Sequence, residues 1–72
     1  MTRTLDDLIQ IVRNGGSLDL QMGNRSKEDL TQLVRNVSEK GTIIFRGANS
    51  RSTDELVHIS RNAMGRVIFV LD

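Results

Sequence analysis

The fold of this chain is decided by a stretch that occurs three times. Residues 4–14 read TLDDLIQIVRN, residues 26–36 read SKEDLTQLVRN, and residues 52–62 read STDELVHISRN. Each copy is followed by a short break that contains glycine and then by an apolar run. Internal repetition at a period of roughly 20–50 residues is typical of one supersecondary unit used several times. We therefore expect a repeat architecture.

Each copy carries the signals of a short helix. Thr4, Ser26 and Ser52 are N-cap residues, whose hydroxyls can accept from the amides of the first turn. Acidic residues follow in the first turn and arginine comes in the last turn, which suits the helix dipole. The acid three residues after each cap predicts a capping box, complete at Glu55. The asparagine that closes each copy tolerates the left-handed conformation that often ends a helix.

The apolar residues of each copy recur at helical spacing. In the middle copy they form one full stripe, which indicates a helix with neighbours on both sides. The predicted core positions are Leu30, Leu33, Val34 and Val37 in the middle copy, Leu8, Ile11, Val12 and Gly15 in the first, and Leu56, Ile59, Ser60 and Ala63 in the third.

Residues 18–22, 42–45 and 66–71 alternate or are rich in β-branched residues, so we expect strands there. A strand–helix–strand connection normally gives a parallel pair with a right-handed crossover. The sequence therefore predicts an α/β fold: three helix–strand repeats that form a short β/α solenoid, with a three-stranded parallel sheet and all helices on one face. We expect a single domain over 1–72, with repeat units at approximately 4–22, 26–46 and 52–71.

The alternation of the strands separates a core face from an outer face. The predicted core face holds Leu18, Leu20, Met22, Ile43, Phe45, Val67, Phe69 and Leu71. The outer face carries Ile44, Ile68 and Val70, with Arg46 and Arg66 around them. Parallel sheets are usually covered on both faces, so exposed aliphatic residues there indicate an interface, although solvated aliphatics are also common. We expect a homodimer or a complex with a protein partner, formed through this face or through the last strand as a free edge.

The loops before the second and third helices indicate an alternative function. Residues 23–26 and 47–52 both place glycine, asparagine and arginine before the N-cap serine. Arg25, Arg46 and Arg51, with the helix starts at Ser26 and Ser52, would be an anion or nucleic-acid site. Neither loop has a known phosphate-binding spacing, glycine and asparagine are also ordinary turn residues, and the acidic first turns would repel phosphate.

Nothing in the composition favours catalysis. The chain has no cysteine and one histidine, and its net charge is +1. We therefore expect no metal site, no cofactor and no enzyme activity, and we assign His58 to a partly exposed helix face. No run approaches the roughly 18 apolar residues that a membrane span needs, and no early stretch resembles a signal peptide. We expect a cytoplasmic protein that does not bind membranes.

Overall fold

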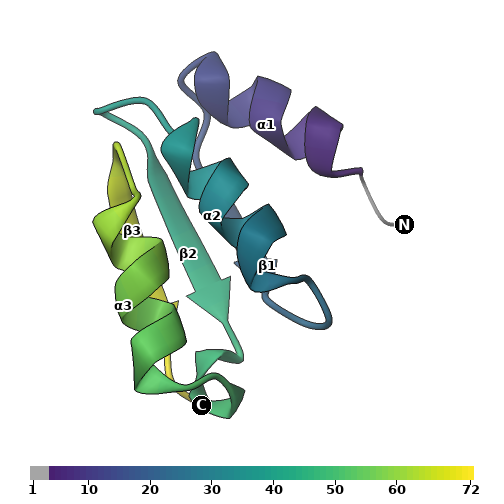
Figure 1. Cartoon of the computed structure of the whole chain (residues 1–72). Coiled ribbons are helices and arrows are strands. Elements are labelled where there is room, and N and C mark those ends of the chain that lie inside the picture. The colour runs from purple at the N-terminus through teal and green to yellow at the C-terminus, as the bar shows by residue number, and fades with distance from the viewer. Residues whose placement is uncertain (1–3) are drawn as a thin grey trace.

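The computed structural model describes residues 4–72, which alternate between helices and strands as predicted (Figure 1). The elements in chain order are α1 (Leu5–Arg13), β1 (Leu18–Gln21), α2 (Lys27–Arg35), β2 (Thr42–Arg46), η1 (Ala48–Ser50), α3 (Thr53–Arg61) and β3 (Arg66–Val70). The short 3₁₀ turn η1 was not predicted, because it falls in a loop with ordinary turn residues.

The three predicted N-caps are confirmed. Thr4 Oγ1 accepts from the Asp7 amide at 3.2 Å, Ser26 Oγ from Asp29 at 3.1 Å, and Ser52 Oγ from Glu55 at 3.2 Å. The capping box predicted at Glu55 is only half formed. Its carboxylate pairs with Arg51 instead of returning to the cap, because a guanidinium is a stronger donor than a backbone amide.

The helices end at the predicted asparagines, but by a different mechanism. The φ angles at Asn14, Asn36 and Asn62 lie between −98° and −92°, so the expected left-handed conformation is wrong. Each side-chain amide instead donates to the carbonyl four residues earlier. In α2 and α3 this bond satisfies a last-turn carbonyl that the backbone amide of the asparagine does not reach, whereas in α1 the backbone amide of Asn14 donates to the same Gln10 carbonyl. The three bonds join Asn14 to Gln10 at 2.7 Å, Asn36 to Gln32 at 2.8 Å, and Asn62 to His58 at 2.8 Å.

The sheet is open, parallel and three-stranded, with the order β1-β2-β3. Leu18 lies opposite Ile43, and Ile43 lies opposite Val67. The helices α2 and α3 lie in front of the sheet and partly hide β1 and β3 behind them (Figure 1). Helix α1 lies beside α2, on the side of α2 that faces away from α3. The predicted parallel pairing is therefore confirmed, and β1 and β3 are both edge strands.

The core lies between the sheet and the helices, and its centre belongs to the middle repeat. The full stripe of α2 is buried, as are Met22, Ile43 and Phe45, as predicted. Phe45 stacks on Phe69, with the ring centroids 6.0 Å apart. The remaining core-face residues of the two edge strands, Leu18, Leu20, Val67 and Phe69, are only partly buried, because an edge strand has a neighbour on one side only.

Some predicted core positions are wrong. Leu71 is exposed because it lies beyond the last residue of β3. In α1, Ile9 is buried and the predicted Ile11 is exposed, since this helix has a helical neighbour only at α2. Ser60 and Gly15 are exposed as well, so the stripes of the outer helices are narrower than that of α2.

Candidate interaction surface

The face of the sheet opposite the helices brings four of the five predicted interface residues together. Ile44 on β2 lies directly beside Ile68 on β3, and Arg46 lies beside Val70. Ile68 is 41% exposed, whereas Ile44 and Val70 are partly buried. We call Ile44, Ile68 and Val70 the aliphatic cluster. Within residues 4–72, no helix or strand covers it (Figure 1).

An ion pair crosses this face beside the aliphatic cluster. Arg46 donates from Nε to Asp19 Oδ1 at 2.7 Å and from Nη2 to Asp19 Oδ2 at 2.9 Å, a bidentate arrangement between β2 and β1. This hydrogen bonding holds the pKa of Asp19 below its ordinary value and raises the pKa of Arg46. The sequence alone does not predict this role for Asp19. The alternation of the strands places Asp19 on the same face as Arg46, but the pairing of the two residues can be predicted only when the register of β1 against β2 is known.

Two further charged residues lie at the margins of the same face. Arg66 is exposed at the start of β3, opposite Thr42. Asp72 accepts from the Gly47 amide at 3.1 Å, and its charge contributes to the raised pKa of Arg46. The aliphatic cluster is therefore bordered by charged groups, of which Arg46 is already neutralised by a partner.

The loop residues predicted to bind an anion are largely engaged with the protein itself. Arg51 pairs with Glu55 and donates from Nη2 to the carbonyls of Gly23 at 3.0 Å and Arg25 at 2.6 Å. Its side chain is only 14% exposed. Ser26 and Ser52 use their hydroxyls as helix caps. Arg46 and Arg51 are both paired with carboxylates, so a bound anion would have to displace these partners. Arg25 contributes its carbonyl to this network and is partly buried.

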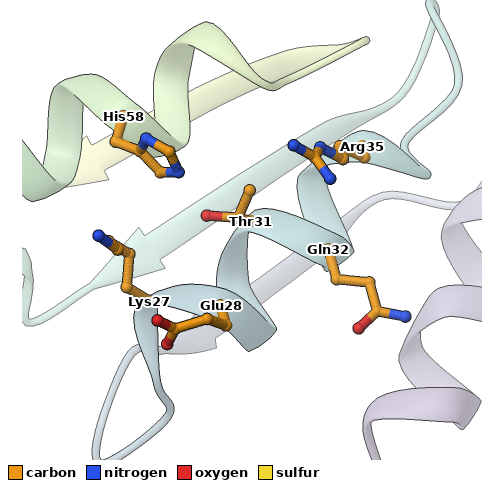
Figure 2. Close-up of a pocket in the computed structure, with 6 residues that line it drawn as sticks. All are labelled: Lys27, Glu28, Thr31, Gln32, Arg35 and His58. Carbon is orange, nitrogen blue, oxygen red and sulfur yellow. The ribbon is translucent and has the colours of Figure 1, made fainter.

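A shallow hollow of about 530 Å³ lies between α2 and α3, and the sequence did not predict it. It is lined by Lys27, Glu28, Thr31, Gln32, Arg35 and His58 (Figure 2). Arg35 donates to Asn62 Oδ1 from Nε at 3.1 Å and from Nη2 at 2.9 Å, which ties α2 to the end of α3. Five of these residues lie on α2 and His58 lies on α3, so the packing of the two helices brings them together.

The hollow carries charged groups of both signs. The positive charges of Lys27 and Arg35 share it with the carboxylate of Glu28. Thr31 Oγ1 is buried and has no hydrogen-bond partner, but the oxygen itself is not in contact with solvent, so a ligand in the hollow would not reach it. Among residues 4–72, no group of histidine and acidic side chains is arranged to hold a metal ion.

Comparisons with known proteins add no relative to this description. No family model matches the chain, and neither a curated protein nor a solved structure is significantly similar to it. The helices between residues 4 and 72 are all too short to cross a membrane.

Proposed function

We propose that this chain is a non-catalytic interaction module that binds a second copy of itself, or another protein, through the outer face of its sheet or a free strand edge. The aliphatic cluster of Ile44, Ile68 and Val70 is the observation that carries this proposal. A parallel sheet is normally covered on both faces, and one face is open within the described residues. A second protein layer would supply the missing cover.

The composition of the face supports this proposal. Specific interfaces have an apolar centre and a polar rim, with arginine enriched. The cluster supplies the apolar centre, and Arg46 and Arg66 lie around it. Because Arg46 is already paired with Asp19, a partner would not have to neutralise its charge. Arg66 would remain available for a polar contact at the rim.

The repeat supports a related proposal about architecture, that the three units form a short β/α solenoid. In a solenoid each unit contacts only its neighbours. The middle unit fits this description, since α2 packs on both α1 and α3 and β2 pairs with both β1 and β3. Such an array has a free strand edge at each end, which is the second route for association in our proposal.

The anion-binding alternative receives less support. An anion site of this kind requires Arg46 and Arg51 as free cations, and both make ion pairs with acidic residues.

A lysine placed in the aliphatic cluster tests the proposal. Ile68→Lys puts a charge at its most exposed residue, and Asn24→Lys in the exposed loop after β1 adds the same charge away from the cluster. We expect Ile68→Lys to keep the circular dichroism spectrum of the parent chain but to weaken its association, as measured by sedimentation velocity. Asn24→Lys should associate like the parent. If Ile68→Lys stays folded and sediments like the parent, the outer face is not the interface.

A further inference from the structure

The large apolar side chains that remain exposed are confined to the two outer repeats. Among residues 4–72 they are Ile11, Val57, Met64, Ile68 and Leu71. None of them belongs to the middle repeat. Two of the five, Ile11 and Val57, occupy positions that are buried in the other copies.

The first of these positions faces the following helix. Ile9, Thr31 and Val57 are equivalent in the three copies. Ile9 and Thr31 are buried, and Thr31 lines the hollow that α2 shares with α3. Val57 is 42% exposed, because within the described chain no helix follows α3.

The second position faces the preceding helix. Ile11, Leu33 and Ile59 are equivalent, and both Leu33 and Ile59 are fully buried. Ile11 is 38% exposed, because within residues 4–72 no helix precedes α1. Inside the molecule, consecutive repeats make the same contact twice, between α1 and α2 and between α2 and α3; we call this contact the internal joint. The outer side of α3 and the outer side of α1 are therefore equivalent to its two contacting surfaces.

The edges of the sheet show the same complementarity. The Arg66 amide donates to the Gly41 carbonyl at 3.0 Å, and the Met22 amide donates to the Arg46 carbonyl at 3.0 Å. Because the backbone groups of successive residues alternate in direction, those of Val67 and Phe69 point to the outer edge of β3, and those of Asp19 and Gln21 point to the outer edge of β1. The outer edge of β3 is thus equivalent to the edge of β1 that already binds β2.

We propose that copies of this chain join head to tail, with the outer side of the third repeat of one copy bound to the outer side of the first repeat of the next. This inference rests on the proposed function and narrows it to the strand edges and to a second copy of the chain. The sheet would continue in parallel, with Val67 of one copy opposite Leu18 of the next, in the register that already joins Leu18, Ile43 and Val67. Val57 and Ile11 would then be covered as Thr31 and Ile59 are.

A polar contact of the internal joint can also be repeated at this junction. Arg35 on α2 donates to the side chain of Asn62 at the end of α3. Their equivalents across the proposed junction are Arg61 of one copy and Asn14 of the next. Solenoids that remain monomeric usually carry polar capping surfaces at their ends, whereas this chain presents Val57 and Ile11. Because the two contacting surfaces differ, the assembly grows into a ring or an open filament rather than a closed dimer.

Two variants that each block one end test this arrangement. Ile11→Lys blocks the first repeat and Val57→Lys blocks the third, at side chains exposed enough to accept lysine in the folded chain. We expect each variant alone to sediment as a monomer, since its one free end has no complementary surface to bind. An equimolar mixture should form a dimer of one copy of each variant and nothing larger. Gln32→Lys, on the exposed surface of α2, is the matched control and should assemble like the parent.

The outcomes separate this inference from the broader proposal. If the parent chain assembles but the mixture stays monomeric, or if either variant still dimerises alone, the head-to-tail joint is wrong and association through the outer face remains. If the parent chain itself stays monomeric at every concentration, self-assembly is wrong in both forms.

A cross-linking experiment gives the same answer if a lysine variant fails to fold. The chain has no cysteine, so Ile11→Cys and Val57→Cys each introduce a single thiol. A short thiol-specific cross-linker should join the two different variants in a mixture and should leave each variant alone uncoupled. Efficient coupling of either variant to itself would overturn the proposal.

Discussion

Thr31 on α2 and Val57 on α3 occupy the same position in consecutive repeats, yet Thr31 is 6% exposed and Val57 is 42% exposed. The difference comes from the neighbours of the two helices, since α3 packs on the side of α2 that carries Thr31 and no described helix packs on the equivalent side of α3. The residue types run against this environment, because the buried residue is polar and the exposed residue is apolar. The contact between α2 and α3 therefore buries a hydroxyl that has no hydrogen-bond partner.

Thr31→Val should stabilise the fold. Valine matches the shape of threonine and removes the buried Oγ1, whose unsatisfied hydrogen bonding is a cost in the folded state. We expect the free energy of unfolding to rise by about 1 kcal/mol, which corresponds to a rise in Tm of roughly 4–8 °C for a chain of this size. Thr31→Ser, which keeps the hydroxyl and loses the methyl, should instead lower the Tm. A loss of stability in Thr31→Val would mean that the hydroxyl has a partner in solution.

Gly65→Ala should destabilise the fold through backbone crowding. A Cβ at this position would meet the carbonyl oxygen of Ser38 and lie 2.7 Å from the carbonyl oxygen of Gly41, and neither backbone group can move aside cheaply. We expect a loss of about 3 kcal/mol in urea unfolding. Gly23→Ala is the comparison, because that site has φ +53° and open space around it, so only backbone strain of about 1 kcal/mol is expected. Equal losses at both sites would contradict the packing of the turn before β3.

Arg51→Met should cost stability, because Arg51 holds two loops together. The substitution leaves Glu55 without its partner and frees the carbonyls of Gly23 and Arg25. We expect a loss of about 2 kcal/mol, below the range for fully buried pairs because both side chains retain some exposure. Arg61→Met on exposed α3 should change the free energy of unfolding of the monomer by less than about 0.5 kcal/mol. If Arg51→Met leaves stability unchanged, the guanidinium is free for another partner.

The ion pair on the outer face predicts a pH dependence. Hydrogen bonding from Arg46 lowers the folded-state pKa of Asp19, so the unfolded state binds the proton more readily. The contribution to stability is therefore fully present above the unfolded-state pKa of about 3.9 and is lost as the pH falls through the folded-state value. An NMR titration should place the Asp19 midpoint below that of an unfolded aspartate, and Arg46→Gln should move it upward. An unchanged midpoint in Arg46→Gln would show that the pair does not persist in solution.

Local signals in the sequence were sufficient to predict the elements. Ser26 and Ser52 begin helices because a hydroxyl at that point satisfies a first-turn amide, and this depends on a few neighbouring residues only. The core face and the outer face of the sheet could be told apart because successive side chains of a strand point to opposite faces, so that Ile43 and Phe45 lie on one face and Ile44 on the other. This pattern also depends on neighbouring residues only. The repeat then made the strand order and the parallel pairing accessible.

Features that depend on contacts between repeats were not predictable from one sequence. The pair of Asp19 with Arg46 needs the register of β1 against β2, and the contacts of Arg51 need the position of a loop 26 to 28 residues away. The exposure of Ile11 could not be read from its spacing, because the equivalent positions, Leu33 and Ile59, are also apolar and only the neighbouring helices differ. The exposed surfaces at Ile11 and Val57 therefore became visible only in the structure.

The most direct test of the central claim is the mass of the unmodified chain in solution, measured by sedimentation equilibrium from micromolar to millimolar concentration. Our proposal of self-association through the uncovered surfaces predicts a weight-average mass that rises with concentration above the 8.1 kDa of one copy. A mass that stays at 8.1 kDa across the whole range would contradict it.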